Sequence, residues 1–160
     1  PALLNEIELQ GVKQVNITLH VGAGTFLPIT TSDSDDHRMH SEWAELTNNA
    51  ISLIIKTKKN GGRVIALGTT VLRVLETAAL NGELRAFSGE TDLFITPGFT
   101  FNVVDLLLTN FHQPRSTLIM LVAAFAGTNR ILEAYEYAKN NGYRFLSYGD
   151  ACLIENINKV

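Results

Sequence analysis

The chain has 160 residues, 46% of them hydrophobic, and a formal net charge of −3 at pH 7. This composition excludes a disordered chain and a strongly basic surface, so any nucleic-acid partner has to meet a local patch. The one cysteine, Cys152, cannot form an intramolecular disulfide, and a free thiol fits the reducing cytoplasm in which we expect the protein to work. The longest apolar run, 118–126, is too short to cross a bilayer, so we expect no membrane partner.

The start of the chain predicts a helix, a strand and a glycine-rich turn. Apolar side chains lie on one side of residues 2–10, which we interpret as a short helix that Gly11 ends. A strand over residues 12–20 follows. It leads into the turn 21–26, where glycines allow the backbone to come close to a ligand. Residues 30–36 are polar and predict a surface loop.

A long amphipathic helix is predicted next. The segment 37–43 opens it, and Asn60, Gly61 and Gly62 end it. Its apolar residues recur at three- and four-residue spacing: Trp43, Leu46, Ala50, Ile51, Ile54 and Ile55. We expect this face to pack on a sheet.

The second half of the chain predicts strands that alternate with helices. Residues 63–68 form a nearly continuous apolar run, which is typical of a strand covered on both faces. Thr69 and Thr70 follow as caps of a helix that ends at Asn81 and Gly82. The remaining expected elements are strands at 92–96, 103–109 and 144–147, a helix at 117–126 between Ser116 and Gly127, and a helix at 128–139.

These elements predict an α/β fold with a mostly parallel or mixed sheet flanked by helices. We expect residues 1–160 to form a single domain and to be part of a larger protein, because Pro1 is not an initiator methionine. Ligands in such sheets bind beyond the carboxyl ends of the strands, and in a parallel sheet those ends share an edge. The polar and glycine residues that follow the expected strands are His20, Gly22, Gly24, Thr25, Gly68, Thr69, Thr70, Asn110, His112, Tyr148 and Asp150.

Candidate groups for proton transfer are close together in the chain at His37, His40 and Glu42. Two imidazoles and a carboxylate can move protons, whereas the alternative is that the histidines are exposed residues ahead of a helix. As zinc ligands the two histidines lack a third ligand and a recognisable spacing. His20 is either a packed, hydrogen-bonded histidine or a catalytic one.

Other polar residues also allow two interpretations. Thr69 and Thr70 either bind a ligand or only cap their helix, and Arg73 either holds a carboxylate or phosphate or lies in solvent. His112 either stacks on a base or shapes its turn. The glycine turn is not the dinucleotide-binding fingerprint, whose third glycine would fall at Leu27. From these residues alone we infer a small-molecule site in an α/β enzyme domain.

Long strings of the sequence are similar to one known family. They are TLHVGAGTF (18–26), HRMHSEW (37–43), GGRVIALGTT (61–70), LFITPGF (93–99), VDLLLTNFHQPRSTLIMLVAAFAG (104–127) and YRFLSYGDACLI (143–154). In this order and over nearly the whole chain, they resemble the S-adenosylmethionine:tRNA ribosyltransferase-isomerases of queuosine biosynthesis.

The resemblance implies a transferase that moves and isomerises the ribosyl part of S-adenosylmethionine onto 7-aminomethyl-7-deazaguanine in tRNA. The implied product is epoxyqueuosine, and adenine and methionine leave. S-adenosylmethionine is thus a ribosyl-donor substrate, and no metal is expected. Members of this family are about twice as long, and their amino-terminal part, with a small β-barrel domain, is missing here.

The implied chemistry suggests roles for the residues in the matching strings. Removal of a ribose proton needs a base and loss of adenine needs an acid, for which His37 and His40, with Glu42, are the candidates. S-adenosylmethionine would lie against His20, Gly22, Gly24, Thr25 and Phe26, with Thr69, Thr70 and Arg73 at a helix N-terminus. The deazaguanine and its tRNA would meet Asn110, Phe111, His112, Tyr148 and Asp150.

Two alternatives remain at this point. The chain by itself can be a non-catalytic ligand-binding or tRNA-docking module, since half of the enzyme is missing. A metal-dependent hydrolase that uses His37 and His40 fits the motifs less well.

Overall fold

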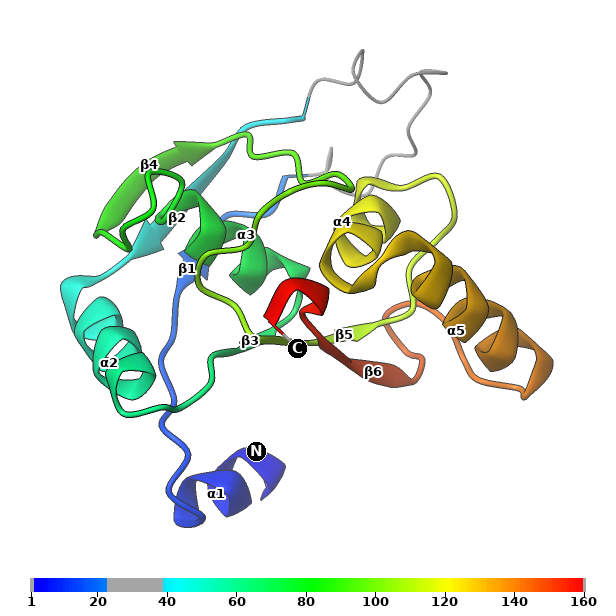
Figure 1. Ribbon diagram of the computed structural model, residues 1–160, viewed down its shortest axis with the longest axis horizontal. Helices are drawn as coiled ribbons and strands as arrows, with labels where there is room; N and C mark the ends of the chain where they lie inside the picture. Colours follow the sequence, from blue (N-terminus) through cyan, green and yellow to red (C-terminus); the bar gives the residue numbers. More distant parts are fainter. Residues whose placement is uncertain (1, 23–38, 160) are drawn as a thin grey trace.

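The structure, a computed structural model, describes residues 2–22 and 39–159 (Figure 1). Helices and strands alternate along much of it, which confirms the expected α/β class. In chain order the elements are α1 Ala2–Leu9, β1 Thr18–Leu19, β2 Glu42–Leu46, α2 Asn48–Lys59, β3 Ile65–Leu67, α3 Thr69–Thr77, β4 Phe87–Thr91, β5 Leu106–Asn110, α4 Thr117–Ala126, α5 Thr128–Asn140, β6 Ala151–Glu155 and the 3-10 helix Ile157–Lys159.

The strands form two small sheets. Sheet A has the order β1-β2-β4 and is antiparallel throughout. Sheet B has the order β3-β5-β6, in which β3 and β5 run parallel while β5 and β6 run antiparallel. The mixed form of the expected sheet is therefore confirmed, and a largely parallel sheet is wrong for the described residues.

The predicted long helix is in fact a strand followed by a shorter helix. Glu42, Ala44 and Leu46 are buried while the residues between them are half-buried, which is the period of two that a strand requires. Thr47 then caps α2, because its side chain accepts a hydrogen bond from the Ala50 amide at 3.4 Å. The spacing between Trp43 and Leu46 matched a helical face only by coincidence.

Several expected strand boundaries are also wrong. The strand at 12–20 shortens to β1, and residues 92–96 and 144–147 are not strands. β4 pairs with the full length of β2 instead, and β6 takes the place of the last expected strand. Both were missed because their sequences, FSGET and ACLIE, mix small or charged residues with apolar ones and have no long apolar run.

The helices of the second half agree with the sequence. The Ser116 side chain caps α4 by accepting from the Ile119 amide at 3.2 Å, and Gly127 separates α4 from α5. The expected threonine caps are wrong, because α3 begins after Gly68 and has no side-chain cap. Gly68 has a φ of 93° and a ψ of 152°, a backbone conformation that only glycine adopts without strain.

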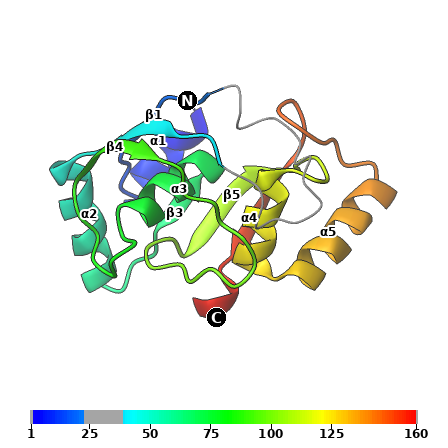
Figure 2. The same cartoon turned by 90° about the horizontal axis from the view of Figure 1, so that it is seen from above.

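Helix α3 lies between the two sheets, and α2 and α5 lie at opposite ends of the molecule (Figures 1 and 2). One cluster of buried side chains includes residues of both sheets, α3 and α4. Ala66, Leu107 and Ile154 turn one face of sheet B into this core. Ile65, Leu67 and Leu153 on the other face are exposed, so the expectation that β3 is covered on both faces is wrong.

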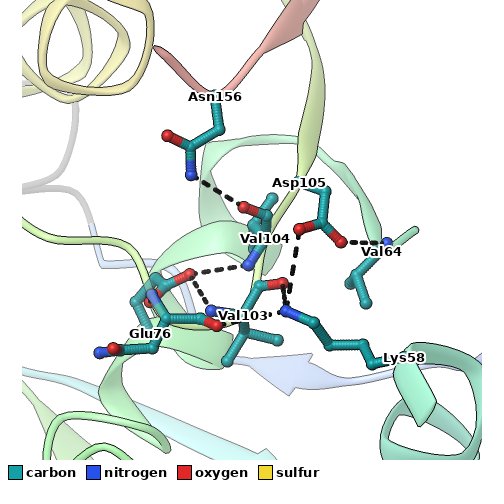
Figure 3. Close-up of polar contacts among 8 residues, drawn as sticks. Lys58, Val64, Glu76, Val103, Val104, Asp105 and Asn156 are labelled. Carbon is teal, nitrogen blue, oxygen red and sulfur yellow. Dashed lines mark hydrogen bonds and ion pairs between the residues drawn. The ribbon is translucent and has the colours of Figure 1, made fainter. Parts of the chain in front are cut away.

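A buried carboxylate fixes the loop that leads into β5. Glu76 of α3 has no exposed surface, and its side chain accepts hydrogen bonds from the backbone N–H groups of Asn102 at 2.7 Å, Val103 at 3.0 Å and Val104 at 2.9 Å (Figure 3). A carboxylate with three such donors is well satisfied away from water. The start of β5 is therefore attached to α3.

Neighbouring polar contacts extend this attachment to α2 and to the end of the chain. Asp105 accepts from the Val64 amide at 2.7 Å, and Lys58 donates to the Val103 carbonyl at 2.7 Å (Figure 3). Asn156 donates from its amide to the Val104 carbonyl at 3.1 Å. The strand β5 thus begins at a fixed position relative to three other elements.

Among the described residues, no single helix is long and apolar enough to cross a membrane. Helices α4 and α5 pass that test only together, and they are bent by 114° with respect to each other.

We predict that Glu76→Ala lowers the free energy of unfolding by about 3–5 kcal/mol, because it leaves the buried N–H groups of Val103 and Val104 and the part-buried N–H group of Asn102 without this acceptor. Glu76→Gln should lose less, since its amide oxygen still accepts. Denaturant unfolding of the purified variants measures both effects. The control Glu133→Ala changes an exposed glutamate on α5 and should stay within about 0.5 kcal/mol of wild type. Equal losses in Glu76→Ala and Glu133→Ala would contradict the anchoring role.

Candidate active site

The first group of candidate residues lies where sheet A meets α3. Glu42 of β2 is 2% exposed, and its Oε1 accepts a hydrogen bond from the Gly22 amide at 2.8 Å. Its Oε2 accepts from Nη1 of Arg73 at 2.6 Å. The start of the glycine turn, β2 and α3 therefore meet at one buried carboxylate.

Arg73 has hydrogen-bonding capacity that the described residues do not use. It is 3% exposed, and its Nε and Nη2 atoms are buried without a hydrogen-bond partner there. A guanidinium keeps its charge in proteins, and buried N–H groups without an acceptor are costly. This edge of Arg73 is thus suited to a ligand that brings oxygen acceptors or a negative charge.

The local sequence explains how Arg73 reaches Glu42. The Gly68 amide donates to the Leu108 carbonyl at 2.8 Å, so the chain leaves β3 beside β5 before it turns into α3. Thr69 is buried and Thr70 half-buried in the first turn of this helix, and Arg73 follows one turn later. The first N–H groups of α3 have no side-chain cap, and such groups favour an anion.

The histidines lie beside this group as far as they are described. His20 extends β1: its amide donates to the Trp43 carbonyl at 2.8 Å, and its ring makes an edge contact with the Trp43 ring at a centroid distance of 5.0 Å. His40 is exposed and precedes Glu42 by two residues. His37 lies outside the described residues.

Part of the predicted glycine turn also lies outside the described residues, namely Gly24, Thr25 and Phe26. Gly22 is described. A Cβ atom at Gly22 would meet the Glu42 Oε1 at 4.0 Å, an ordinary contact. Its fixed feature is the hydrogen bond of its amide to Glu42.

The second group of candidates lies at one edge of sheet B. Asn110 ends β5 and pairs with Ala151, the first residue of β6. Asp150 is therefore at this edge because it precedes β6, not because it follows a strand. Asp150 accepts from the Arg144 amide at 2.8 Å and from its guanidinium at 3.1 Å, and these hydrogen bonds lower the pKa of the Asp150 carboxyl. Tyr148 is almost fully exposed.

Phe111 and His112 are buried next to this edge. The Phe111 ring packs against Tyr135, Tyr143 and Phe145, and it lines a cavity of about 470 Å3 between α5 and β6. His112 Nε2 lies 3.1 Å from the Thr109 hydroxyl, and its amide donates to the Tyr135 hydroxyl at 3.1 Å. Burial lowers the pKa of His112 to about 4 and raises that of Tyr135 to about 12. Both side chains are therefore neutral at pH 7.

The structure brings most described candidates into these two groups, and α3 connects them. Gly68, Thr69 and Asn110 share an edge because β3 and β5 are parallel. Glu42 belongs to sheet A, and His20 and Gly22 follow β1. Glu42 bonds both the Gly22 amide and Arg73 of α3, which connects this group with the edge of sheet B. Among described residues, no three His, Cys, Asp or Glu side chains are placed to hold a metal ion.

Sequence reasoning missed three polar residues near these groups. Glu76 anchors α3, and Thr109 and Tyr135 satisfy the polar atoms of His112. A charged residue between Leu75 and the apolar Ala78 was the available signal for Glu76, since a buried stripe rarely includes one without a partner. For Thr109 and Tyr135 we find no such signal.

We predict that His112 makes the stability of the protein depend on pH between about 6.5 and 4. Over this range the unfolded state binds a proton that the folded state excludes, so stability falls as pH falls, by up to roughly 3 kcal/mol. His112→Gln cannot titrate and should lose this part of the slope, while its curve stays parallel to wild type above pH 7. Unfolding free energies of both proteins, determined from pH 8 to pH 4, measure this pH dependence of stability. Identical slopes in both proteins would contradict a buried neutral imidazole.

Comparisons with known proteins agree with the motifs. The family described as queuosine biosynthesis protein matches residues 1–154. S-adenosylmethionine:tRNA ribosyltransferase-isomerases of Zymomonas mobilis and Coxiella burnetii are 56% and 59% identical, over 95% and 91% of this chain. The chain covers 45% and 42% of these two relatives, so it spans less than half of their length.

A solved structure of a protein with a related name also matches this chain. The crystal structure of an S-adenosylmethionine tRNA ribosyltransferase from Thermotoga maritima superposes with a TM-score of 0.80 at 42% identity, and the match covers 96% of this chain and 49% of that one. With a family match over residues 1–154, this chain belongs to the queuosine biosynthesis protein family.

Proposed function

We propose that the protein with this chain transfers and isomerises the ribosyl group of S-adenosylmethionine onto 7-aminomethyl-7-deazaguanine in tRNA, giving epoxyqueuosine, in the cytoplasm. Family membership and the names of the relatives support this activity. The single structural observation on which we base the site is Arg73, a buried guanidinium with Nε and Nη2 unpartnered among the described residues.

Arg73 is proposed to bind the methionine carboxylate of S-adenosylmethionine. Its Nε and Nη2 lie on one edge of a planar fork, which matches the two oxygens of a carboxylate. The Nη1 atom is already used by Glu42. The uncapped N-terminus of α3, with Thr69 and Thr70, adds further donors for negative charge.

Glu42 is proposed to position other groups rather than to transfer a proton. Its carboxylate already accepts from the Gly22 amide and from Arg73, and it is buried. It thereby fixes the orientation of Arg73 and the position of Gly22, the first glycine of the turn. Gly24, Thr25 and Phe26 of that turn remain our candidates for contact with the substrate, together with His20.

Proton transfer is proposed for His37 and His40. One imidazole removes the proton from the ribose carbon next to the sulfonium, and the other protonates the leaving adenine; the two roles can be exchanged. His40 is exposed and two residues from Glu42, so a substrate bound at Arg73 has an imidazole nearby in the chain.

The edge of sheet B is proposed to recognise the base. Asn110 offers both an amide donor and an acceptor there, and neutral His112 holds the adjoining turn through Thr109. Phe111 supports the same turn from the aromatic cluster. Tyr148 and Asp150 belong to the loop that borders this edge.

The chain is proposed to supply one wall of the active site. Because it spans less than half of its relatives, the other wall and a small β-barrel domain would come from the amino-terminal part of the full-length protein. The isolated chain should accordingly fold without releasing adenine from S-adenosylmethionine in the presence of substrate tRNA.

We predict that Arg73→Lys in the full-length protein raises the KM for S-adenosylmethionine by about 10- to 150-fold, the loss expected for a hydrogen bond to a charged group. Lysine keeps the charge next to Glu42 but has no second donor edge, so the melting temperature should change little. Adenine release, measured against S-adenosylmethionine concentration with saturating tRNA, gives KM and kcat separately.

The matched control is Arg63→Lys, at an exposed arginine at the opposite end of β3. It should keep the wild-type KM. An unchanged KM in Arg73→Lys would contradict carboxylate binding by Arg73, and absence of adenine release by the wild-type protein would contradict the proposed function itself.

We also predict that His37→Ala or His40→Ala lowers the single-turnover rate by about 100- to 10,000-fold in the full-length protein. Affinity for S-adenosylmethionine and thermal stability should stay near wild type, because a proton-transfer group acts mainly in the transition state. If both variants react at wild-type rates, the assignment fails and His20 and His112 become the next candidates. A joint loss of binding and stability would mean that the histidines only shape the loop.

A further inference from the structure

The two loops at the edge of sheet B contain unusual backbone conformations. Among the described residues, Arg115 and Leu146 are the non-glycine residues with positive φ, at 57° and 67°. Arg115 lies in the loop after β5, and Leu146 lies in the loop before β6. The two loops touch, because the Leu146 amide donates to the Phe111 carbonyl at 2.9 Å. Conformations of this kind are costly and cluster at functional sites.

The loop before β6 is held in its shape by its own contacts. The Asp150 amide donates to the Arg144 carbonyl at 2.8 Å, and the Gly149 amide donates to the Leu146 carbonyl at 3.0 Å. The Asp150 carboxylate accepts from Arg144 in return. A Cβ atom at Gly149 would lie 2.3 Å from the Arg144 carbonyl oxygen, so only glycine fits this closed turn.

This turn presents an aromatic ring to the solvent. Tyr148 is 97% exposed at its tip, between Ser147 and Gly149, which are polar or small. Its position comes from the turn, not from packing of the ring. Arg115 is exposed in the adjoining loop and makes no ion pair with another described residue. An exposed aromatic ring and an exposed guanidinium without an ion pair among the described residues therefore belong to two loops that touch at the Leu146–Phe111 hydrogen bond.

We propose that these two loops, 111–116 and 144–150, form a stacking platform for an unpaired nucleotide of tRNA. A splayed base stacks on the Tyr148 ring, and Arg115 contacts a neighbouring phosphate. The inference rests on the proposed function for the identity of the RNA. It adds the surface that holds the tRNA loop next to Asn110 at the edge of sheet B.

The chemistry of the platform favours RNA over a protein partner. A protein interface needs an apolar centre around its aromatic anchor, whereas the chain neighbours of Tyr148 are Ser147 and Gly149, and Leu146 of the same turn is only 43% exposed. The chain has a net charge of −3, so RNA binding requires local cations such as Arg115. The pre-formed turn also lowers the cost of ordering the loop backbone on binding.

The test uses the full-length protein and a labelled synthetic tRNA anticodon stem-loop, with affinity measured by fluorescence anisotropy at fixed salt. Tyr148→Ala should weaken binding by about 5- to 150-fold, the value of one base stacked on an aromatic side chain. Tyr148→Phe and Tyr148→Trp keep a ring and should bind within about twofold of wild type or more tightly. Arg115→Ala should reduce the salt slope by about 0.7–0.9, as expected for one phosphate contact.

Two further variants make the test specific. Tyr137→Ala removes a tyrosine on α5 that is also exposed, at 63%, and should leave the affinity unchanged. Gly149→Ala keeps Tyr148 but disturbs the turn, and should weaken RNA binding as Tyr148→Ala does. Wild-type affinity in Tyr148→Ala, or equal losses in Tyr148→Ala and Tyr137→Ala, would overturn the platform.

Binding of S-adenosylmethionine and release of adenine separate this inference from the function on which it rests. In Tyr148→Ala the affinity for S-adenosylmethionine without RNA should match wild type. If wild-type protein releases adenine while Tyr148→Ala binds the stem-loop normally, only the platform is wrong. If wild-type protein releases no adenine, the proposed function is wrong, and the direct RNA measurement still decides for or against the platform.

Discussion

The fully buried Glu76 side chain accepts hydrogen bonds from three backbone N–H groups, and these bonds hold the segment that leads into β5 of sheet B. Short loops leave their N–H groups unpaired, and burial of such groups is costly. Because Glu76 accepts hydrogen bonds from these N–H groups, the chain can enter β5 through the core. Helix α3 contacts sheet A through Arg73 and, at Thr77, through a hydroxyl pair with Thr91 of β4 at 2.7 Å. One short helix therefore sets the positions of both sheets.

Burial of the ion pair between Arg73 and Glu42 also costs free energy. Moving two charges out of water costs several kcal/mol for each ion, and an apolar pair of similar size is often as stable. A structural purpose alone would not require Arg73 to keep two buried nitrogen atoms that have no hydrogen-bond partner in the part of the chain that the structure describes. Under our proposal the pair is a charge prepared in advance, whose hydrogen bonds a substrate oxygen would complete in a medium that screens charge poorly.

Sequence reasoning worked where local chemistry decides the structure. Helix α4 was predicted correctly because Ser116 and Gly127 flank an apolar run. Arg73 became a candidate because it follows a strand and the start of a helix. It failed where pairing between distant segments decides. Trp43 lies in a strand because β4 pairs with β2, and nothing near Trp43 in the chain reports on FSGET more than forty residues later. Glu76 and Arg115 stayed unnoticed for a related reason, since their roles depend on loops that fold against them.

The exposed face of sheet B has a consequence for handling the chain. Ile65, Leu67 and Leu153 give that face an apolar stripe, and β3 and β6 are the outer strands of the sheet among the described residues. An outer strand with unpaired N–H and C=O groups beside apolar side chains can pair with the same strand of another molecule. We therefore expect this edge of sheet B to favour self-association of the folded chain in concentrated solution, and a lysine on either outer strand to reduce it.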